Sequence, residues 1–210
     1  RFGTDQQKQR WLRPMAEGAI RSCFAMTEPD AGSDPRRISG RAEQLPGGRW
    51  RINAHKVFTS SAQGASLVLV MVVTDPDADA HAGQTIFLVS TSAQGFSIVR
   101  DIKTMGTHGF AGHAETRFAD VIVGPDAMLG EPRQGFAIAQ SRLGVGRLGH
   151  AMRWIGIAQR SLDLAAARAQ SRETFGAPLA SRQAVQWWLA DDATKLHACR
   201  LMVLDACRKI

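Results

Sequence analysis

The chain has 210 residues, which is enough to form one or two domains with a buried core. Hydrophobic residues make up 44% and charged residues 21%, values typical of globular proteins, and no apolar run reaches the roughly 18 residues that a membrane-spanning helix needs. The three cysteines show no CxxC spacing, which argues against a disulfide framework or a structural zinc site and predicts reduced thiols in the cytoplasm. Because the first residue is Arg1 and not Met, we expect the chain to be part of a longer one.

The formal net charge is +7, and the excess is concentrated in the later part of the chain. Between residues 142 and 182, only Asp163 and Glu173 oppose a series of arginines: Arg142, Arg147, Arg153, Arg160, Arg168, Arg172 and Arg182. Such a region attracts polyanions, either a phosphate-rich cofactor or nucleic acid. A solvated, arginine-rich helix face is the simpler interpretation of the charge alone.

The first element is predicted to be helical. Thr4 and Gln7 have the spacing of a capping box, and apolar residues follow at helical intervals until Gly18, which is predicted to end the helix. This segment, residues 1–19, is interpreted as the end of a helical domain.

Residues 20–130 are predicted to form a β domain. Four runs have the length and the β-branched or alternating composition of strands, namely residues 67–73, 85–89, 96–99 and 116–123. Gly- and Pro-containing turns separate them, for example at residues 46–48 and 124–126. Many short strands with such turns favour an antiparallel barrel or sandwich over alternating βαβ units.

Residues 131–210 are predicted to be helical again and to form the first part of an incomplete helical bundle. One helix is expected from about 135 to 169, and Ser181 is expected to cap a last helix that continues to the end of the chain. Gly144, Gly146 and Gly149 each cost up to about 1 kcal/mol inside a helix, so they indicate close packing or close ligand approach. The predicted fold class is therefore α+β, with a β domain between helical segments.

A family resemblance enters with the sequence TEPDAGSD at residues 27–34, preceded by Phe24 and Met26. This segment resembles the signature of the acyl-CoA dehydrogenase family, and the resemblance covers essentially the whole chain. It implies an FAD site to which Phe24, Met26, Thr27, Gly32 and Ser33 contribute. Small residues let backbone amides approach a ligand, and the Thr27 hydroxyl can donate a hydrogen bond.

A second match, NAHKVFTS at residues 53–60, resembles a family segment in which an aromatic side chain packs near the flavin ring and a hydroxyl reaches the flavin edge. Here Phe58 stands where tryptophan is usual and Ser60 where threonine is usual. Both substitutions keep an apolar plane and a hydroxyl, so the resemblance implies that Phe58, Thr59 and Ser60 bind the cofactor. Core packing is the alternative role for Phe58.

Two further matches lie in the helical part. RETFG at residues 172–176, followed by Gln183, resembles a stretch that reaches the FAD of a neighbouring subunit, which implies roles for Arg172, Thr174 and Gln183 and a homodimer or homotetramer. Arg182 stands where the family has histidine, so no contact is carried over to it. RLGVGR at residues 142–147 places Arg147, with Ser33, at positions associated with acyl-CoA, and this wording is most similar to the acyl-CoA dehydrogenase 10 and 11 subgroup.

The resemblance implies flavin-dependent α,β-dehydrogenation of an acyl-CoA thioester, with electron-transfer flavoprotein as the acceptor. In this chemistry a carboxylate removes the α-proton while hydride passes to the flavin. The family usually places this base later than Ile210; a minority place it where this chain has Gly146, which cannot act. Glu28 is expected to be structural, so no catalytic residue is assigned.

Alternative functions remain open from sequence alone. One is an acyl-CoA oxidase or flavin monooxygenase in which oxygen reaches the reduced flavin, and another is a nucleic-acid-binding flavoprotein of the alkylation-response type. The second is disfavoured because aromatic residues do not alternate with the arginines. A non-catalytic, truncated scaffold is a third. A metal site at His108 and His113 is not expected, since their spacing fits no common ligand set.

Overall fold

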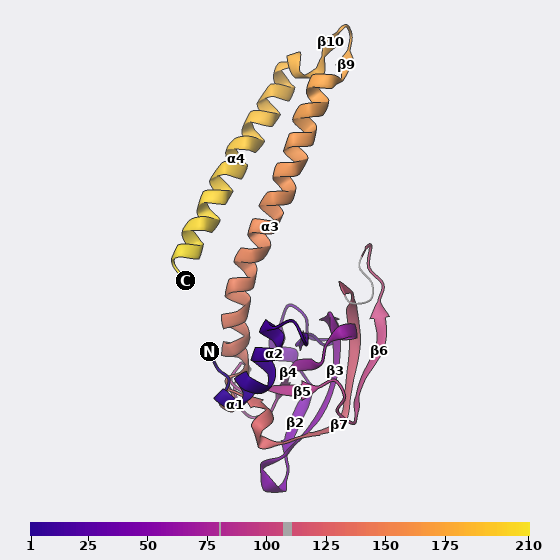
Figure 1. Cartoon of the computed structure of the whole chain (residues 1–210), viewed down its shortest axis with the longest axis vertical. Helices are drawn as coiled ribbons and strands as arrows, with labels where there is room; N and C mark the ends of the chain where they lie inside the picture. Colours follow the sequence, from indigo (N-terminus) through magenta and orange to yellow (C-terminus); the bar gives the residue numbers. More distant parts are fainter. Residues whose placement is uncertain (80, 107–110) are drawn as a thin grey trace. The chain divides into compact units, whose positions relative to one another are not determined.

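The computed structural model describes residues 1–79, 81–106 and 111–210. Contacts divide the chain into two compact units, Arg1–Ala139 and Gln140–Ile210 (Figure 1). The first contains a short helical segment and the sheet, and the second contains most of two long helices. The division into segments 1–19, 20–130 and 131–210 stays a prediction.

The N-terminal segment is helical, with α1 (Asp5–Gln7), a π-helical turn η1 (Lys8–Leu12) and α2 (Arg13–Ala16). The predicted capping box is confirmed: the Gln7 backbone N–H donates to Thr4 Oγ1 at 3.2 Å, and the Thr4 N–H donates to Gln7 Oε1 at 3.0 Å. Gly18 has a φ of 74°, a left-handed conformation that ends the helical path.

One mixed sheet forms the body of the first unit, in the order β6-β7-β3-β2-β4-β5-β8, with β1 paired to β4. Its strands are β1 (Ser22–Ala25), β2 (Arg41–Gln44), β3 (Trp50–Ser60), β4 (Leu67–Val73), β5 (Gln84–Ser90), β6 (Phe96–Ile102), β7 (His113–Val123) and β8 (Met128–Leu129). Most pairings are antiparallel, as predicted, but β1 and β2 meet β4 in parallel. Short 3₁₀ turns connect them: Pro35–Arg37, Pro46–Gly48, Ala62–Gly64 and Pro125–Ala127.

The predicted strands are confirmed. The run at 67–73 has the bounds of β4, and the other three runs lie within β5, β6 and β7. Strands β4 and β5 are almost entirely buried because apolar clusters lie on both of their faces: Val70 and Phe87 belong to one cluster, and Met71 and Ile86 to the other. This two-sided burial explains why β4 is a continuous apolar run without alternation.

The second unit is a helical hairpin. Helix α3 (Gly135–Ser171), which begins in the first unit, is followed by the short strands β9 (Glu173–Thr174) and β10 (Ala177–Pro178), a 3₁₀ turn (Leu179–Ser181) and helix α4 (Gln183–Arg208) (Figure 1). The prediction that Ser181 caps α4 is wrong. Its hydroxyl donates to the Pro178 carbonyl at 2.7 Å, and Arg182 occupies the N-cap position. Among the helices of the described residues, none is long and apolar enough to span a membrane.

Candidate functional site

A buried ion pair connects the two sequence motifs of the β domain. Lys56 is fully buried, Glu28 is 4% exposed, and the Lys56 Nζ atom lies 2.8 Å from Glu28 Oε1. Lys56 also donates to the Met26 carbonyl at 3.0 Å and to the Met71 carbonyl at 2.6 Å. One cation therefore joins residues from the 27–34 motif region, β3 and β4.

Glu28 accepts three more hydrogen bonds. The Ser39 N–H and hydroxyl each donate to Oε2 at 2.8 Å, and the Gly40 N–H donates to Oε1 at 2.9 Å. Burial raises the pKa of Glu28, but Lys56 and Ser39 outweigh it and the net shift is downward. Burial lowers the pKa of Lys56 to about 8, against the opposing effect of Glu28. The carboxylate is thus fully used in holding the chain together, which agrees with the structural role expected for it.

The ion pair places the two motifs side by side. The Val57 N–H donates to the Thr27 carbonyl at 2.9 Å, so residues 27 and 57 are in direct backbone contact. Phe24 and Met26 are half-buried and pack against the apolar cluster that contains Met71. Segments separated by about thirty residues in sequence therefore form one continuous surface.

Phe58 has an unusual backbone and an exposed ring. Its φ is 55°, a conformation that is rare for a bulky residue, and its side chain is 57% exposed. It lies in an irregularity of the β3–β7 register between Lys56 and Thr59. Strict alternation would put Lys56, Phe58 and Ser60 on one face. Because the register shift follows Lys56, that side chain stays in the core, whereas Phe58 and Ser60 are presented outward. The strained backbone at Phe58 therefore exposes its aromatic ring on the same face as the Ser60 hydroxyl.

The residues after Phe58 divide between the two faces. Thr59 is fully buried, with its Oγ1 atom 3.3 Å from Thr116 Oγ1, so its side chain faces the interior. Ser60 is exposed, and its Oγ atom lies 2.8 Å from Nδ1 of His113 on β7. Sequence reasoning missed this histidine as a partner of Ser60, because only the strand register brings residues 60 and 113 together.

The GSD part of the first motif forms an open loop. Gly32 and Ser33 are exposed, and a Cβ placed on Gly32 would meet no atom within 4 Å, so the backbone there is open to a ligand. Asp34 accepts from the Arg36 backbone N–H at 3.1 Å and from its Nε atom at 2.7 Å, which caps the following 3₁₀ turn. The hydrogen bond with Arg36, opposed by weaker desolvation, lowers the pKa of Asp34 to about 2.

The third motif lies at one end of the helical hairpin. Phe175 and Gly176 both have positive φ, 52° and 74°, in the tight turn between β9 and β10. Phe175 is 99% exposed at this tip, a feature that the sequence signalled only through its neighbouring glycine. Arg182, to which no cofactor contact was carried over, donates to the Thr174 carbonyl at 3.0 Å and so holds the turn.

The other predicted residues of the helical unit are also exposed. Arg172 follows α3, and Gln183 begins α4, so both lie at the same end of the hairpin as Thr174. Arg147 lies on α3 with His150 and Trp154 at offsets of three and seven, which places the three on one exposed helical face. Gly146, considered from sequence as an alternative position for the base, has no side chain to supply one.

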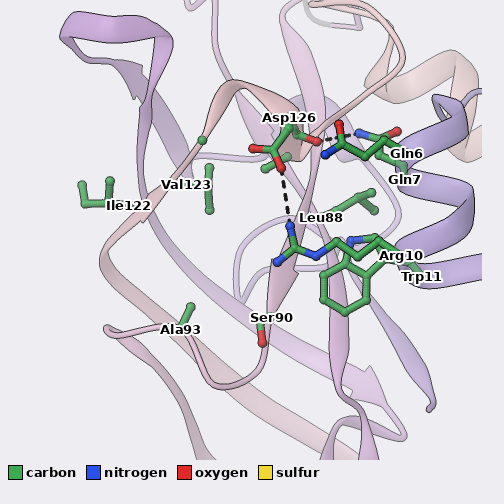
Figure 2. A pocket seen from close by; sticks show the side chains of 12 residues that line it. Gln6, Gln7, Arg10, Trp11, Leu88, Ser90, Ala93, Ile122, Val123 and Asp126 are labelled. Carbon is green, nitrogen blue, oxygen red and sulfur yellow. Dashed lines mark hydrogen bonds and ion pairs between the residues drawn. The ribbon is translucent and has the colours of Figure 1, made fainter. Parts of the chain in front are cut away.

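The first unit contains a cavity of about 210 Å³. Figure 2 shows that it is enclosed by the N-terminal helical segment and the β5 and β7 regions, with Arg10, Trp11 and Asp126 at its wall. The Arg10 Nη1 atom is 3.5 Å from Asp126 Oδ2, and Gln7 Nε2 donates to the Asp126 carbonyl at 2.8 Å. None of the predicted site residues lines it, and its volume is below the roughly 300–1,000 Å³ of typical ligand pockets.

Metal-ligating side chains do not cluster in the described ranges. No group of three His, Cys, Asp or Glu side chains there could hold a metal ion. Of the two histidines considered from sequence, His108 lies outside the described residues, whereas His113 contacts Ser60.

Comparison with known proteins gives a consistent result. The family model "Acyl-CoA dehydrogenase, middle domain" matches residues 23–121, and "Acyl-CoA dehydrogenase, C-terminal domain" matches residues 133–210. Acyl-CoA dehydrogenase family member 10 of Mus musculus is 41% identical over 210 residues, which cover 98% of this chain and 20% of that protein. The chain spans between 20% and 50% of the length of such curated relatives.

Solved structures agree with the sequence matches. Butyryl-CoA dehydrogenase from Megasphaera elsdenii has a TM-score of 0.92 and 34% identity, over 99% of this chain and 54% of that one. The FAD complex of PigA also has a TM-score of 0.92, with 26% identity over 99% of this chain and 54% of that one. The mouse relative supports the resemblance to the 10 and 11 subgroup. The chain belongs to the acyl-CoA dehydrogenase family, whose middle domain matches residues 23–121 and whose C-terminal domain matches residues 133–210.

Proposed function

We propose that the protein containing this chain is an FAD-dependent acyl-CoA dehydrogenase, which removes hydrogens from the α and β carbons of an acyl-CoA thioester. The observation that carries the proposal is the outward presentation of Phe58 and Ser60 next to Thr27, held in place by the buried Glu28–Lys56 pair. Family membership supports the same reaction.

The residues present fit FAD. The Phe58 ring offers an exposed apolar plane to a flat ring system, and the Ser60 hydroxyl is two residues away on the same face. Gly32 leaves the backbone open, which suits the close approach of a polar ligand. When bound, FAD supplies the hydride acceptor. The cofactor contacts proposed for this β domain are Phe24, Met26, Thr27, Gly32, Ser33, Phe58, Thr59 and Ser60.

The environments of these residues suggest different contributions. Phe24 and Met26 are half-buried and pack against the apolar cluster that contains Met71, which holds this part of the surface in place. The Thr59 side chain faces the core, so we assign its contribution to the backbone. The hydroxyls of Thr27 and Ser60 are the groups proposed to donate hydrogen bonds to the cofactor.

Substrate binding is proposed for Ser33 and Arg147. Ser33 is exposed in the GSD loop, and the guanidinium of Arg147 is suited to an anionic group of the CoA moiety. The α-proton requires a general base within hydrogen-bond reach. Glu28 is locked by four donors and Gly146 has no side chain, so we propose that a carboxylate outside these 210 residues is the base.

The test is anaerobic addition of a panel of acyl-CoA thioesters to the full-length protein with bound flavin. Dehydrogenation is expected to bleach the oxidised flavin absorbance and to produce the enoyl-CoA. Reoxidation is then compared between an artificial electron acceptor and oxygen, because a dehydrogenase favours the former and an oxidase the latter. Flavin that binds but is bleached by no thioester would refute the assigned reaction.

A homodimer or homotetramer is part of the proposal. Arg172, Thr174 and Gln183 lie together at an exposed end of the helical hairpin, where they are available to an FAD bound by a neighbouring subunit. Replacing Arg172 by Ala should weaken the binding free energy of FAD by about 1.5–3 kcal/mol, the range for a charge-assisted hydrogen bond. Light scattering that shows a monomer with full FAD content would contradict this arrangement.

The electron acceptor and the location complete the proposal. Electron-transfer flavoprotein is proposed as the acceptor, and a cytoplasmic location is proposed because Cys23, Cys199 and Cys207 are free thiols. The proposed acceptor is tested by mixing purified electron-transfer flavoprotein with the protein and an acyl-CoA, and monitoring reduction of the electron-transfer flavoprotein by its absorbance.

A further inference from the structure

The structure pairs a motif hydroxyl with a histidine from another strand. In the β3–β7 ladder, Ser60 stands directly opposite His113, and Ser60 Oγ is 2.8 Å from His113 Nδ1. Both residues lie at strand ends, Ser60 as the last residue of β3 and His113 as the first of β7. The adjacent Ser61 N–H donates to the Gly112 carbonyl at 2.9 Å, which fixes the two backbones beside the pair.

This contact determines where the Ser60 hydroxyl proton is available. A serine hydroxyl has one proton to donate and lone pairs to accept, whereas Nδ1 of neutral imidazole either donates or accepts according to the tautomer. If Nδ1–H donates to Oγ, the Ser60 proton remains free for an outside acceptor. If Nδ1 accepts from Oγ, the lone pairs of Ser60 remain free for an outside donor.

Both situations suit a flavin. The edge of oxidised flavin presents ring nitrogens that accept hydrogen bonds, and two-electron reduction turns one of them into an N–H donor. A hydroxyl that can reverse its direction matches both redox states, and a tautomeric histidine behind it permits that reversal without an unsatisfied polar group.

We propose that His113 is a positioning residue that orients the Ser60 hydroxyl toward FAD and so tunes the relative affinity for the oxidised and reduced cofactor. This inference rests on the proposed function, in which Ser60 contacts FAD. His113 itself is assigned no contact with the cofactor or the substrate.

The surroundings of His113 favour this role over membership in the nearby charged cluster. Glu115, two residues along β7, accepts from Arg100 Nε at 2.6 Å and lies 2.7 Å from His55 Nε2. That carboxylate is therefore engaged by Arg100 and His55, while His113 contacts the hydroxyl. His55 provides a matched control, since it is a histidine on the same two-strand pair but bonded to a carboxylate.

The experiment measures FAD affinity and midpoint potential of the full-length protein with His113→Leu, His113→Asn, His55→Leu and Ser60→Ala. His113→Leu is expected to change the ratio of affinities for oxidised and reduced FAD by about tenfold, the scale of one hydrogen bond, which is about 30 mV for a two-electron couple. His113→Asn, which keeps an amide group near the place of Nδ1, should restore most of the potential. His55→Leu should leave it unchanged.

A double-mutant cycle separates positioning from strand stability. If His113 acts through Ser60, His113→Leu has no further effect on the potential in the Ser60→Ala background. Additive shifts, or a His113→Leu protein with the wild-type potential, would overturn the inference. If His113→Leu does not fold, His113→Ala, which also removes the Nδ1 contact, is compared with and without Ser60→Ala and gives the same decision. Failure of the unaltered protein to bind FAD would instead overturn the proposed function.

Discussion

Replacing Glu28 by Gln removes the charge at the junction of the two β-domain motifs while keeping the shape of the side chain. Oε1 accepts from Gly40 N–H and Lys56, and Oε2 accepts from the N–H and hydroxyl of Ser39. A glutamine keeps one oxygen and turns the other into an NH₂ group. In one orientation the Lys56 ammonium and the Gly40 N–H lose this acceptor; in the other the Ser39 N–H loses it, while the Ser39 hydroxyl can rotate to accept from the amide.

The expected loss follows from those contacts. Breaking a buried ion pair by removing one charge costs about 3–5 kcal/mol, because the remaining charge is buried without compensation. Since domains have unfolding free energies of about 5–15 kcal/mol, this is a large fraction of the total. With a urea dependence of about 1–3 kcal/mol per molar, the unfolding midpoint should fall by roughly 1–5 M.

The assay is urea unfolding of the full-length protein followed by circular dichroism, with Glu17→Gln as the matched control. The Glu17 Oε1 atom is 3.0 Å from Arg13 Nε, but both side chains are exposed, so this substitution should cost no more than about 1 kcal/mol. FAD content should fall in Glu28→Gln and stay unchanged in Glu17→Gln. Equal midpoints for the two variants would refute the structural role given to the Glu28–Lys56 pair.

Three other perturbations test separate parts of the structure. The folded pKa of Glu28 lies below its ordinary value of 4.5, so the stability that its charge contributes is present above that pH and is lost as the pH falls through the folded pKa. When denaturation is measured across pH, Glu28→Gln should lack this acid-dependent loss of stability. Phe58→Gly should relieve about 1–2 kcal/mol of left-handed backbone strain, so the unfolding temperature of the FAD-free protein should rise while FAD binding weakens. A lower unfolding temperature than that of the unaltered protein would argue against strain. Gly40→Ala should lower the melting temperature of the protein, because the added Cβ would stand 2.6 Å from Glu28 Oε1 and 2.7 Å from the Ala54 Cβ. Gly32→Ala, whose added Cβ meets no atom within 4 Å, should leave the melting temperature unchanged, and equal melting temperatures for the two variants would contradict the packing described.

The sequence supported the prediction of local elements well where local chemistry determines them. Thr4 and Gln7 form the expected capping box, and the apolar run of β4 was recognisable because it is buried on both faces. Ser181 was assigned incorrectly as a cap because its hydroxyl finds the Pro178 carbonyl in the preceding turn instead. Local propensity did not indicate that competing partner.

The residue types of the proposed site could be singled out from the sequence, but their geometry could not. Motif spacing singled out Phe58 and Ser60, but strict strand alternation would have placed Lys56 on the same face; the register shift that separates them is visible only in the pairing with β7. The His113 contact depends on the same long-range register. The parallel pairing of β1 with β4 likewise joins segments more than forty residues apart, which no local pattern reports.

The most direct test of the central claim is titration of the FAD-free full-length protein with FAD, compared with Phe58→Gly and Ser60→Ala variants whose folding is confirmed by circular dichroism. The structure predicts that the unaltered protein takes up FAD and becomes yellow. It also predicts that each variant binds more weakly, by up to about tenfold for the loss of one hydrogen bond at Ser60. A folded protein that takes up no FAD, or variants that both bind it as tightly as the unaltered protein, would contradict the claim that Phe58 and Ser60 form the cofactor surface.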